Sequence, residues 1–187
     1  MRRAMRHDGA HLFRADGSAI RPGTVWLDER SKPQMKSLGD RLGGAEIHRI
    51  SGKPLDVTPC LYRCQWLAEN EPENYYAAER IAEVHGFLVF RLTGKWATST
   101  ASADPMGLLD MAAGDWSDVL LEAVGLERRQ MPELFRPGRR MGDISAEAAA
   151  ATGLSAGTPV IAGGGDGQCA GTGADVLAAG RAYINLG

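Results

Sequence analysis

The chain has 187 residues, of which 44% are hydrophobic and 24% charged, so it can form one good-sized domain with a real core. Its formal net charge of -2 gives no electrostatic argument for nucleic acid or an anionic membrane surface as a partner. No apolar stretch approaches the roughly 18 residues of a membrane span, and the basic start Met1–Arg6 lacks the apolar run of a signal peptide.

The first part of the chain is predicted to combine short strands with one helix. His11–Arg14 reads as a strand that ends at the turn signal Asp16-Gly17, and Thr24–Leu27 reads as a second strand. A helix is predicted over residues 28–42, because apolar residues recur there at steps of three and four and Gly43-Gly44 follows.

The middle of the chain is predicted to be helical. Apolar faces indicate helices over residues 61–68 and 76–92, and Thr93-Gly94 is typical of a helix C-cap. Residues 97–104 are small and polar, and we expect them to be weakly structured.

The last third alternates short helices with strands. The predicted elements are a helix over 118–124, an Ala-rich helix over 146–151 with Ser145 as its N-cap, a strand over 158–162, a small-residue helix over about 168–177 and a strand over 181–186. This mixture favours an α/β or α+β layer architecture.

The three cysteines, Cys60, Cys64 and Cys169, form an odd and sparse set that is typical of a reducing compartment, and this predicts a cytoplasmic protein. Cys60 and Cys64 stand four residues apart, but no matching Cys/His pair completes a zinc site. We therefore expect them to be small buried apolar side chains and predict no metal site from protein ligands.

The glycine-rich turn at residues 163–168 holds the most informative acid of the sequence. A strand, then glycines, then a helix places backbone N–H groups at a helix N-terminus, a geometry that suits phosphates. Asp166 lies in this turn, after the carboxyl end of the strand, where α/β sheets bind their ligands. A carboxylate there can accept the proton of a substrate hydroxyl during phosphoryl transfer.

Two other interpretations of this turn remain open from the residues alone. The glycines can simply permit close helix–strand packing, with Asp166 as a cap. Residues 165–170 also match the dinucleotide fingerprint G-x-G-x-x-A. The second match is weak, because the acid would repel a pyrophosphate and no later strand supplies the ribose-binding acid.

Six motifs in a fixed order carry a family resemblance across residues 21–187. They are Arg21–Arg30, Trp66-Leu67 with Asn70–Glu73, Phe90–Gly94, Ala103 with Gly107–Asp110 and the later Trp116, Ile161–Gln168 with Ala170-Gly171, and Gly180–Gly187. Together they resemble the N-terminal domain of the FGGY-type carbohydrate kinases.

The resemblance implies an α/β fold of the actin-like, ribonuclease-H-like ATPase type. It identifies residues 1–187 as part of the N-terminal, sugar-binding domain, and we expect the first phosphate loop and the C-terminal domain to be missing from this chain. The implied reaction is ATP-dependent phosphorylation of a sugar or polyol hydroxyl, with Mg²⁺. The implied partners are a small sugar or polyol and ATP, with no nucleic acid and no membrane, and a homodimer is left open.

The resemblance also implies roles for individual residues. Asp166 would be the general base, and Trp26 would form a wall of the sugar pocket. The remaining candidates are Asp28, Arg30 and Gln168 for substrate, and Gly165 and Gly187 for the nucleotide.

Some positions depart from the family pattern and bear on the substrate. Gly167 stands where an amide usually follows the acid, Arg63 replaces a common lysine, and Ser99 and Asp104 stand where Asp and Ser are more usual. The glycine run favours the xylulokinase branch, so a ketopentose such as xylulose is the first candidate. The alternative is a non-catalytic remnant that binds sugar weakly at most.

Overall fold

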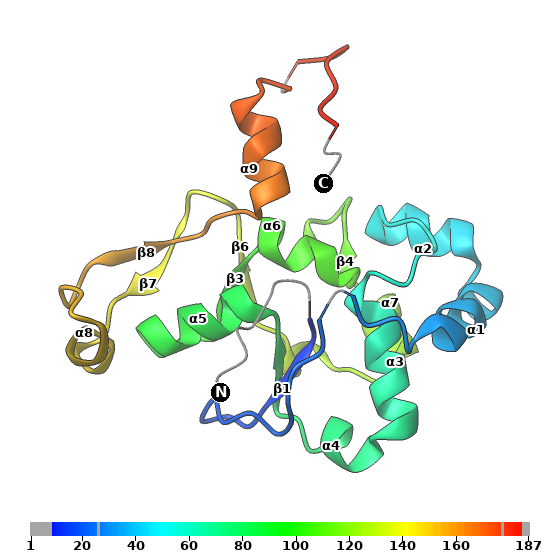
Figure 1. Ribbon diagram of the computed structural model, residues 1–187, viewed down its shortest axis with the longest axis horizontal. Helices are drawn as coiled ribbons and strands as arrows, with labels where there is room; N and C mark the ends of the chain where they lie inside the picture. Colours follow the sequence, from blue (N-terminus) through cyan, green and yellow to red (C-terminus); the bar gives the residue numbers. More distant parts are fainter. Residues whose placement is uncertain (1–8, 26, 177, 185–187) are drawn as a thin grey trace.

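The computed structural model describes residues 9–25, 27–176 and 178–184 (Figure 1). Its strands are β1 (His11–Phe13), β2 (Arg80–Ala82), β3 (Ala97–Ser99), β4 (Leu109–Asp110), β5 (Asp115–Trp116), β6 (Glu133–Phe135), β7 (Arg140–Asp143) and β8 (Pro159–Ile161). Its helices are α1 (Lys32–Leu42), α2 (Gly44–Ser51), α3 (Cys60–Asn70), α4 (Pro72–Tyr76), α5 (Val84–Thr93), α6 (Thr100–Ala103), α7 (Asp118–Ala123), α8 (Ala146–Thr152) and α9 (Asp166–Gly173), with short 3-10 turns η1 (Asp104–Met106) and η2 (Arg128–Gln130).

The strands pair two by two. Strand β1 pairs antiparallel with β2, β4 with β5 and β7 with β8, whereas β3 runs parallel to β6. The register places Leu12 opposite Ile81 and Thr98 opposite Leu134. Within the described ranges no sheet has more than two strands, so helix packing holds most of the structure together.

Two apolar cores support these pairs. The larger one joins β1 and β2 to α1, α2, α3 and α7, and its fully buried members include Leu12, Leu38 and Leu67. Burying one such side chain stabilises the fold by about 1.5–3 kcal/mol. The smaller core joins α5 and β3 to the antiparallel β7–β8 pair through Val89, Met141 and Ala162. It therefore fixes the strand that leads into the glycine turn.

The helix predicted over residues 76–92 is wrong in its first half. Helix α4 ends at Tyr76, strand β2 follows at Arg80–Ala82, and α5 begins only at Val84. Glu83 sets this boundary, because its carboxylate accepts a hydrogen bond from the N–H of Gly86 and so caps α5. The predicted C-cap is confirmed, since Gly94 ends α5 with a φ of 76°.

The prediction that residues 97–104 are weakly structured is also wrong. They form β3, α6 and the start of η1, and Thr98 and Ser99 are fully buried. The burial is tolerated because the polar groups are paired. The Thr98 hydroxyl donates to Glu83, and the Ser99 oxygen accepts from the N–H of Ala101 at 3.2 Å.

Other predictions have mixed outcomes. Strand β1, helix α3, and helix α8 with its Ser145 cap are confirmed, the cap accepting from the N–H of Ala148 at 3.1 Å. The strand expected at residues 24–27 is wrong, because Thr24 and Val25 belong to no strand. The first long helix begins at Lys32 instead of residue 28, and α9 begins at Asp166 instead of residue 168. Residues 181–184 form no strand.

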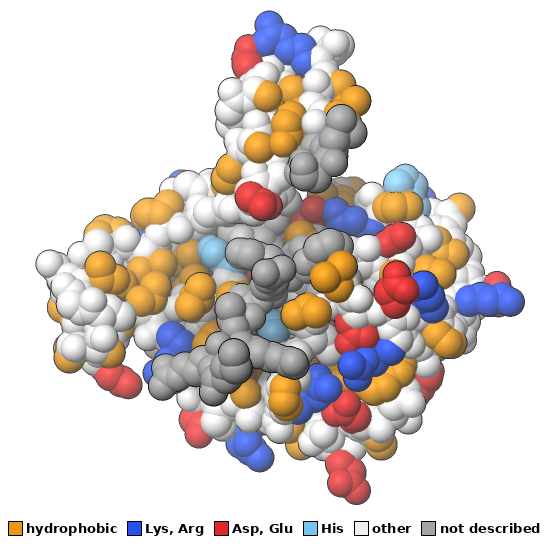
Figure 2. All heavy atoms as spheres, viewed as in Figure 1, with side chains coloured by type: hydrophobic (Ala, Val, Ile, Leu, Met, Phe, Trp, Pro, Cys, Tyr) orange, Lys and Arg blue, Asp and Glu red, His pale blue; other side chains and the backbone are white. Residues whose placement is uncertain are grey.

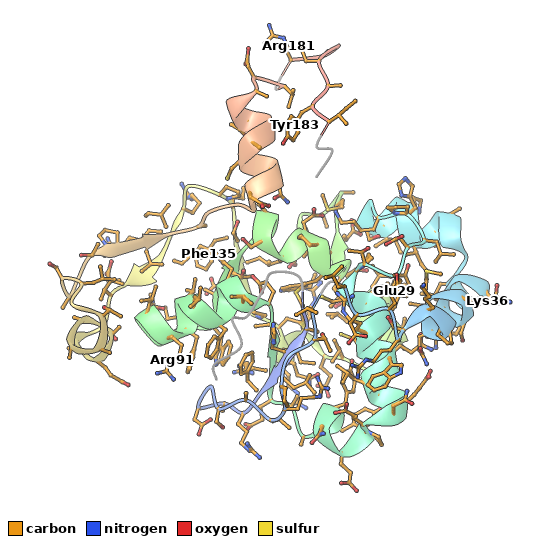
Figure 3. The ribbon with its side chains drawn as sticks, viewed as in Figure 1. Glu29, Lys36, Arg91, Phe135, Arg181 and Tyr183 are labelled. Atoms are coloured by element: carbon orange, nitrogen blue, oxygen red, sulfur yellow. The ribbon has the colours of Figure 1, made fainter. Side chains whose placement is uncertain are left out.

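Helix α9 and the segment after it project from the rest of the molecule (Figures 1 and 2). The segment turns back along the helix, and the side chain of Tyr183 lies beside α9 (Figure 3). A methyl group on Gly171 would meet the Tyr183 ring at 3.8 Å, which agrees with this contact. The base of α9 is consequently the part that meets the main body.

His11 is a buried histidine, and its environment in the folded chain destabilises the protonated imidazole. It is 4% exposed on β1, and neither ring nitrogen has a hydrogen-bond partner among the described residues. Burial, assisted by the charges of Arg21 and Arg63, lowers the pKa of His11 from 6.5 to about 4. The unfolded chain therefore binds this proton more tightly, and stability falls as the pH drops from 6.5 towards 4.

We expect the chain to lose about 2 kcal/mol of unfolding free energy through His11 between pH 7 and pH 5. Substitution His11→Leu should remove this part of the pH dependence, because leucine does not titrate. Urea unfolding at both pH values measures the difference. The control is His48→Gln on the exposed face of α2, which should keep the full loss. Equal pH dependence in the natural chain and the His11→Leu variant would contradict the assignment.

Candidate functional site

A cavity of about 630 Å³ lies where the start of α9 meets the main body. That volume is in the range of small-molecule sites. Four parts of the chain form its wall, namely the loop between α2 and α3, the start of α5, the α6–η1 segment and the start of α9. The residues are Lys53, Pro54, Asp56, Thr58, Pro59, Glu83, His85, Ala101, Ser102, Asp104, Pro105 and Gly165–Gln168.

Asp166 is the first residue of α9 and lines this cavity. Its side chain is exposed, and its Oδ1 accepts a hydrogen bond from the N–H of Gly167 at 2.8 Å. A carboxylate at the first turn of a helix is favoured by the helix dipole. The structure thus places the predicted acid at a helix N-terminus beside a cavity, after the glycine turn that follows β8.

Gly165 and Gln168 lie next to this acid in the cavity wall. The Gln168 amide donates from Nε2 to the carbonyl of Ala101 at 3.2 Å and so joins α9 to α6. A Cβ on Gly165 would lie only 2.4 Å from the Gln168 Oε1, whereas Gly163 and Gly167 face open space. A side chain at position 165 would therefore displace the Gln168 amide from this position.

Glu83, Thr98 and His85 form a hydrogen-bonded chain at another side of the cavity. Glu83 is 4% exposed, and Thr98 donates its hydroxyl to Oε1 of Glu83. The Nδ1 of His85 lies 3.0 Å from the Thr98 oxygen. The Thr98 hydroxyl has only one proton and a carboxylate only accepts, so Nδ1 of His85 carries the proton and donates. This arrangement fixes the orientation of the imidazole in the wall.

Lys53 and Asp104 form an ion pair in the same wall. The Lys53 ammonium lies 2.6 Å from Oδ2 of Asp104, and the two side chains are 25% and 19% exposed. In the sequence, Asp104 stands out only as a departure from the family pattern, and Lys53 does not stand out at all. No local pattern could have joined them, because 51 positions separate the two residues.

Arg63 holds the loop that carries part of the wall. It is 1% exposed on α3 and donates to the carbonyls of Thr58 at 2.7 Å and Val57 at 3.3 Å. A forked guanidinium can reach two carbonyls at once, which a lysine would do less rigidly. The departure from lysine thus has a structural role in this chain.

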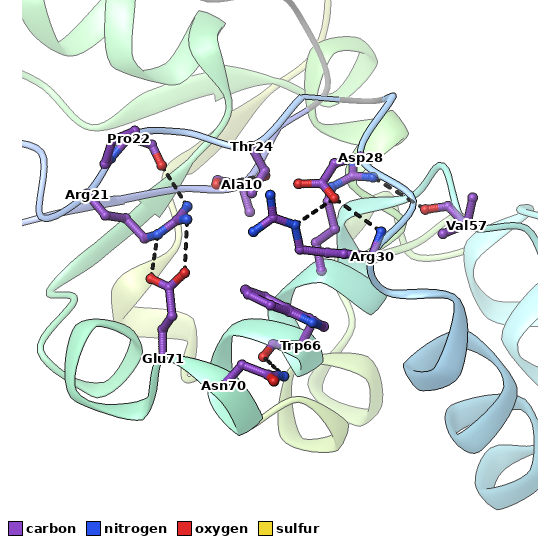
Figure 4. A network of polar contacts seen from close by, with 11 residues as sticks. Ala10, Arg21, Pro22, Thr24, Asp28, Arg30, Val57, Trp66, Asn70 and Glu71 are labelled. Atoms are coloured by element: carbon purple, nitrogen blue, oxygen red, sulfur yellow. Dashed lines mark hydrogen bonds and ion pairs between the residues drawn. The ribbon is translucent and has the colours of Figure 1, made fainter.

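Asp28 and Arg30 do not line the cavity. Arg30 donates from Nε to Asp28 at 2.8 Å, and its guanidinium lies 4.7 Å from the Trp66 ring centre (Figure 4). In the same view Arg21 forms two hydrogen bonds to Glu71, at 2.7 and 3.0 Å. These contacts tie the segment to α3 and α4, and its binding roles stay predictions. Trp26 and Gly187 lie outside the described residues.

The cysteine prediction is confirmed for two positions, since Cys60 and Cys64 are fully buried. Burial raises the pKa of the Cys64 thiol to about 12, so it stays protonated. Across the described ranges, no His, Cys, Asp and Glu side chains gather in threes as a metal site would need. The same ranges contain no helix with the length and apolarity of a bilayer span.

Known proteins match this chain over most of its length. The model of the FGGY family of carbohydrate kinases, N-terminal domain, matches residues 4–173. The xylulose kinase of Escherichia coli K12 is 32% identical over 179 residues, covering 96% of this chain and 36% of the relative. The autoinducer-2 kinase of Klebsiella pneumoniae is 32% identical over 184 residues, covering 95% and 34%. The chain spans about a third of the length of these relatives.

Solved structures agree with this match. A xyloylose kinase from Brucella ovis superimposes with a TM-score of 0.79 at 28% identity, covering 86% of this chain and 33% of that one. The xylulose kinase from Rhodospirillum rubrum reaches 0.86 at 23% identity, covering 92% and 35%, and supports the fold alone. The predicted actin-like α/β fold class is confirmed. The chain belongs to the FGGY family of carbohydrate kinases and corresponds to part of their N-terminal domain.

Proposed function

We propose that this chain is the sugar-binding part of an ATP-dependent kinase that phosphorylates a hydroxyl of a sugar or polyol, with Asp166 as the general base. The observation that carries the proposal is the position of Asp166. It stands at the N-terminus of α9 and lines a cavity whose wall also holds Lys53, His85, Asp104 and Gln168. Such a mixture of donors and acceptors suits a ligand with many hydroxyl groups.

The geometry of Asp166 fits a proton acceptor. One carboxylate oxygen is held by the Gly167 N–H, and the side chain makes no other hydrogen bond with the described residues. The second oxygen is therefore available to a substrate hydroxyl. As the hydroxyl oxygen attacks phosphorus, its proton passes to this carboxylate. Gln168, anchored to Ala101, would orient the acceptor beside it.

ATP would supply the transferred phosphoryl group, and Mg²⁺ would offset the charge of its phosphates. The described residues hold no cluster suited to the metal, and Gly165 alone represents the predicted nucleotide contacts among them. Since the chain spans about a third of its relatives, we propose that it contributes the acceptor side of the site.

The relatives suggest two acceptors. One is a xylulose kinase and the other an autoinducer-2 kinase, with the same identity of 32%. Xylulose stays the first candidate because the glycine turn favours it. The dinucleotide-binding alternative has less support, because β8 pairs antiparallel with β7, whereas that motif requires a parallel β-α-β unit.

We expect the 187-residue chain alone to show no ATP-dependent turnover of xylulose. Phosphoryl transfer needs nucleotide and acceptor held in line, and the described residues provide groups for the acceptor. A coupled assay of ADP release, with and without xylulose, measures this. Sugar-dependent ADP release by the pure chain would refute the division of roles.

The general-base role of Asp166 can be tested in a chimaera, in which residues of this chain replace the matching segment of the E. coli xylulose kinase. Substitution Asp166→Asn should lower kcat by about 100-fold or more, because general-base catalysis typically contributes that much. The matched control is Asp175→Asn, an exposed acid after α9 that pairs with Arg181 and should leave kcat unchanged.

Thermal unfolding of each chimaera shows whether it is folded. A folded chimaera whose kcat is unaffected by Asp166→Asn would exclude the general-base role. A folded chimaera with no turnover, even with Asp166 present, would favour the alternative of a non-catalytic remnant.

A further inference from the structure

The charges of the cavity wall are unequal. Among the described residues, the wall carries four carboxylates, on Asp56, Glu83, Asp104 and Asp166, against one ammonium, on Lys53. Hydrogen bonds from the side chain and backbone of Thr58 hold the pKa of Asp56 below its usual range, so this acid is ionised at neutral pH. An anionic ligand that enters the cavity would therefore meet a surplus of negative charge.

The Lys53 ammonium is already neutralised. Lys53 lies 2.6 Å from Asp104, and this is its only side-chain hydrogen bond with the described residues. Asp104 Oδ2 accepts only from Lys53 within the described part of the chain, and a carboxylate oxygen has a second lone pair. The pair thus offers N–H donors on Lys53 and unfilled acceptor capacity on Oδ2 of Asp104.

This combination is selective for hydroxyl groups. A hydroxyl can donate to the Asp104 carboxylate and also accept from the Lys53 ammonium, so two adjacent hydroxyls satisfy both partners. An ionised carboxylate or phosphate group that takes the place of one of these hydroxyls against the pair supplies only acceptors, and so cannot satisfy Asp104. It also gains little from an ammonium whose charge is balanced within 2.6 Å.

We infer that the Lys53–Asp104 pair is a specificity determinant that binds adjacent hydroxyls of a neutral polyol or ketose and rejects sugar acids and sugar phosphates. The inference rests on the proposed function, because it concerns the same cavity as Asp166. Asp166 acts on the hydroxyl that reacts, whereas this pair recognises the hydroxyls that do not. The two residues reach the wall from the α2–α3 loop and from η1, whereas Asp166 comes from α9.

Xylitol and xylonate provide a matched pair of ligands, since they share a five-carbon chain and differ at one end in a hydroxymethyl or a carboxylate. Binding to the natural 187-residue chain is measured by ligand-observed NMR titration. We expect xylitol to bind at least about tenfold more tightly than xylonate.

Substitution Asp104→Asn frees the Lys53 charge and should move the affinity ratio towards xylonate by about tenfold. Substitution Lys53→Met should weaken xylitol binding without any gain for xylonate. The controls are Asp40→Asn and Lys36→Met, both on the outer side of α1 (Lys36 is labelled in Figure 3), and they should keep the natural ratio.

A gain of xylonate affinity in Asp104→Asn supports the inference, and a misfolded variant cannot produce it. The inference is overturned if the natural chain binds xylonate as tightly as xylitol, or binds neither, or if the ratio is unchanged in Asp104→Asn. These readouts concern binding alone. The chimaera assay for Asp166 measures turnover, so a failure of the proposed kinase activity is seen separately.

Discussion

The buried carboxylate of Glu83 constrains the centre of this structure. A buried carboxyl group is tolerated only when polar partners surround it. Glu83 receives the N–H of Gly86, which starts α5, and the hydroxyl of Thr98, which fixes β3. Thr98 in turn accepts from His85 and sets the imidazole in the cavity wall. Glu83 therefore lies between the end of β2 and the start of α5. Its hydrogen bonds join this boundary to β3, the strand that precedes the site.

The position of α9 depends on the strand that Glu83 fixes. Strand β3 leads into α6, and the carbonyl of Ala101 receives the amide of Gln168. The smaller core holds β8 against α5 and β3 through Val89 and Ala162, so the chain leaves β8 towards Asp166 from a fixed point. The base of α9 is thus held by one apolar contact region and one hydrogen bond, although the rest of the helix projects outwards (Figure 1).

The sequence predicts the glycine turn, its acid and the family, because these depend on residues close together or on motifs in order. Prediction from the sequence fails where a partner that is distant in the sequence determines the local structure. Residues 97–104 look too polar to be ordered, yet Glu83 and backbone groups satisfy their hydroxyls. The apolar spacing around Ile81 also suits a helix face, and pairing with β1 makes this segment a strand. Lys53 carries no local signal, because its partner lies 51 residues away.

The exchange of polar groups at positions 99 and 104 has a physical explanation. Ser99 needs no charge, because a hydroxyl suffices to cap α6 through the N–H of Ala101. A charge at position 104 would be costly in this half-buried place without a partner. Lys53 supplies that partner from the α2–α3 loop, and the buried Arg63 holds the later part of that loop at Val57 and Thr58. The departure at position 104 thus lies in the cavity wall, whereas the departure at position 63 has a structural role, because Arg63 holds the loop that carries part of that wall.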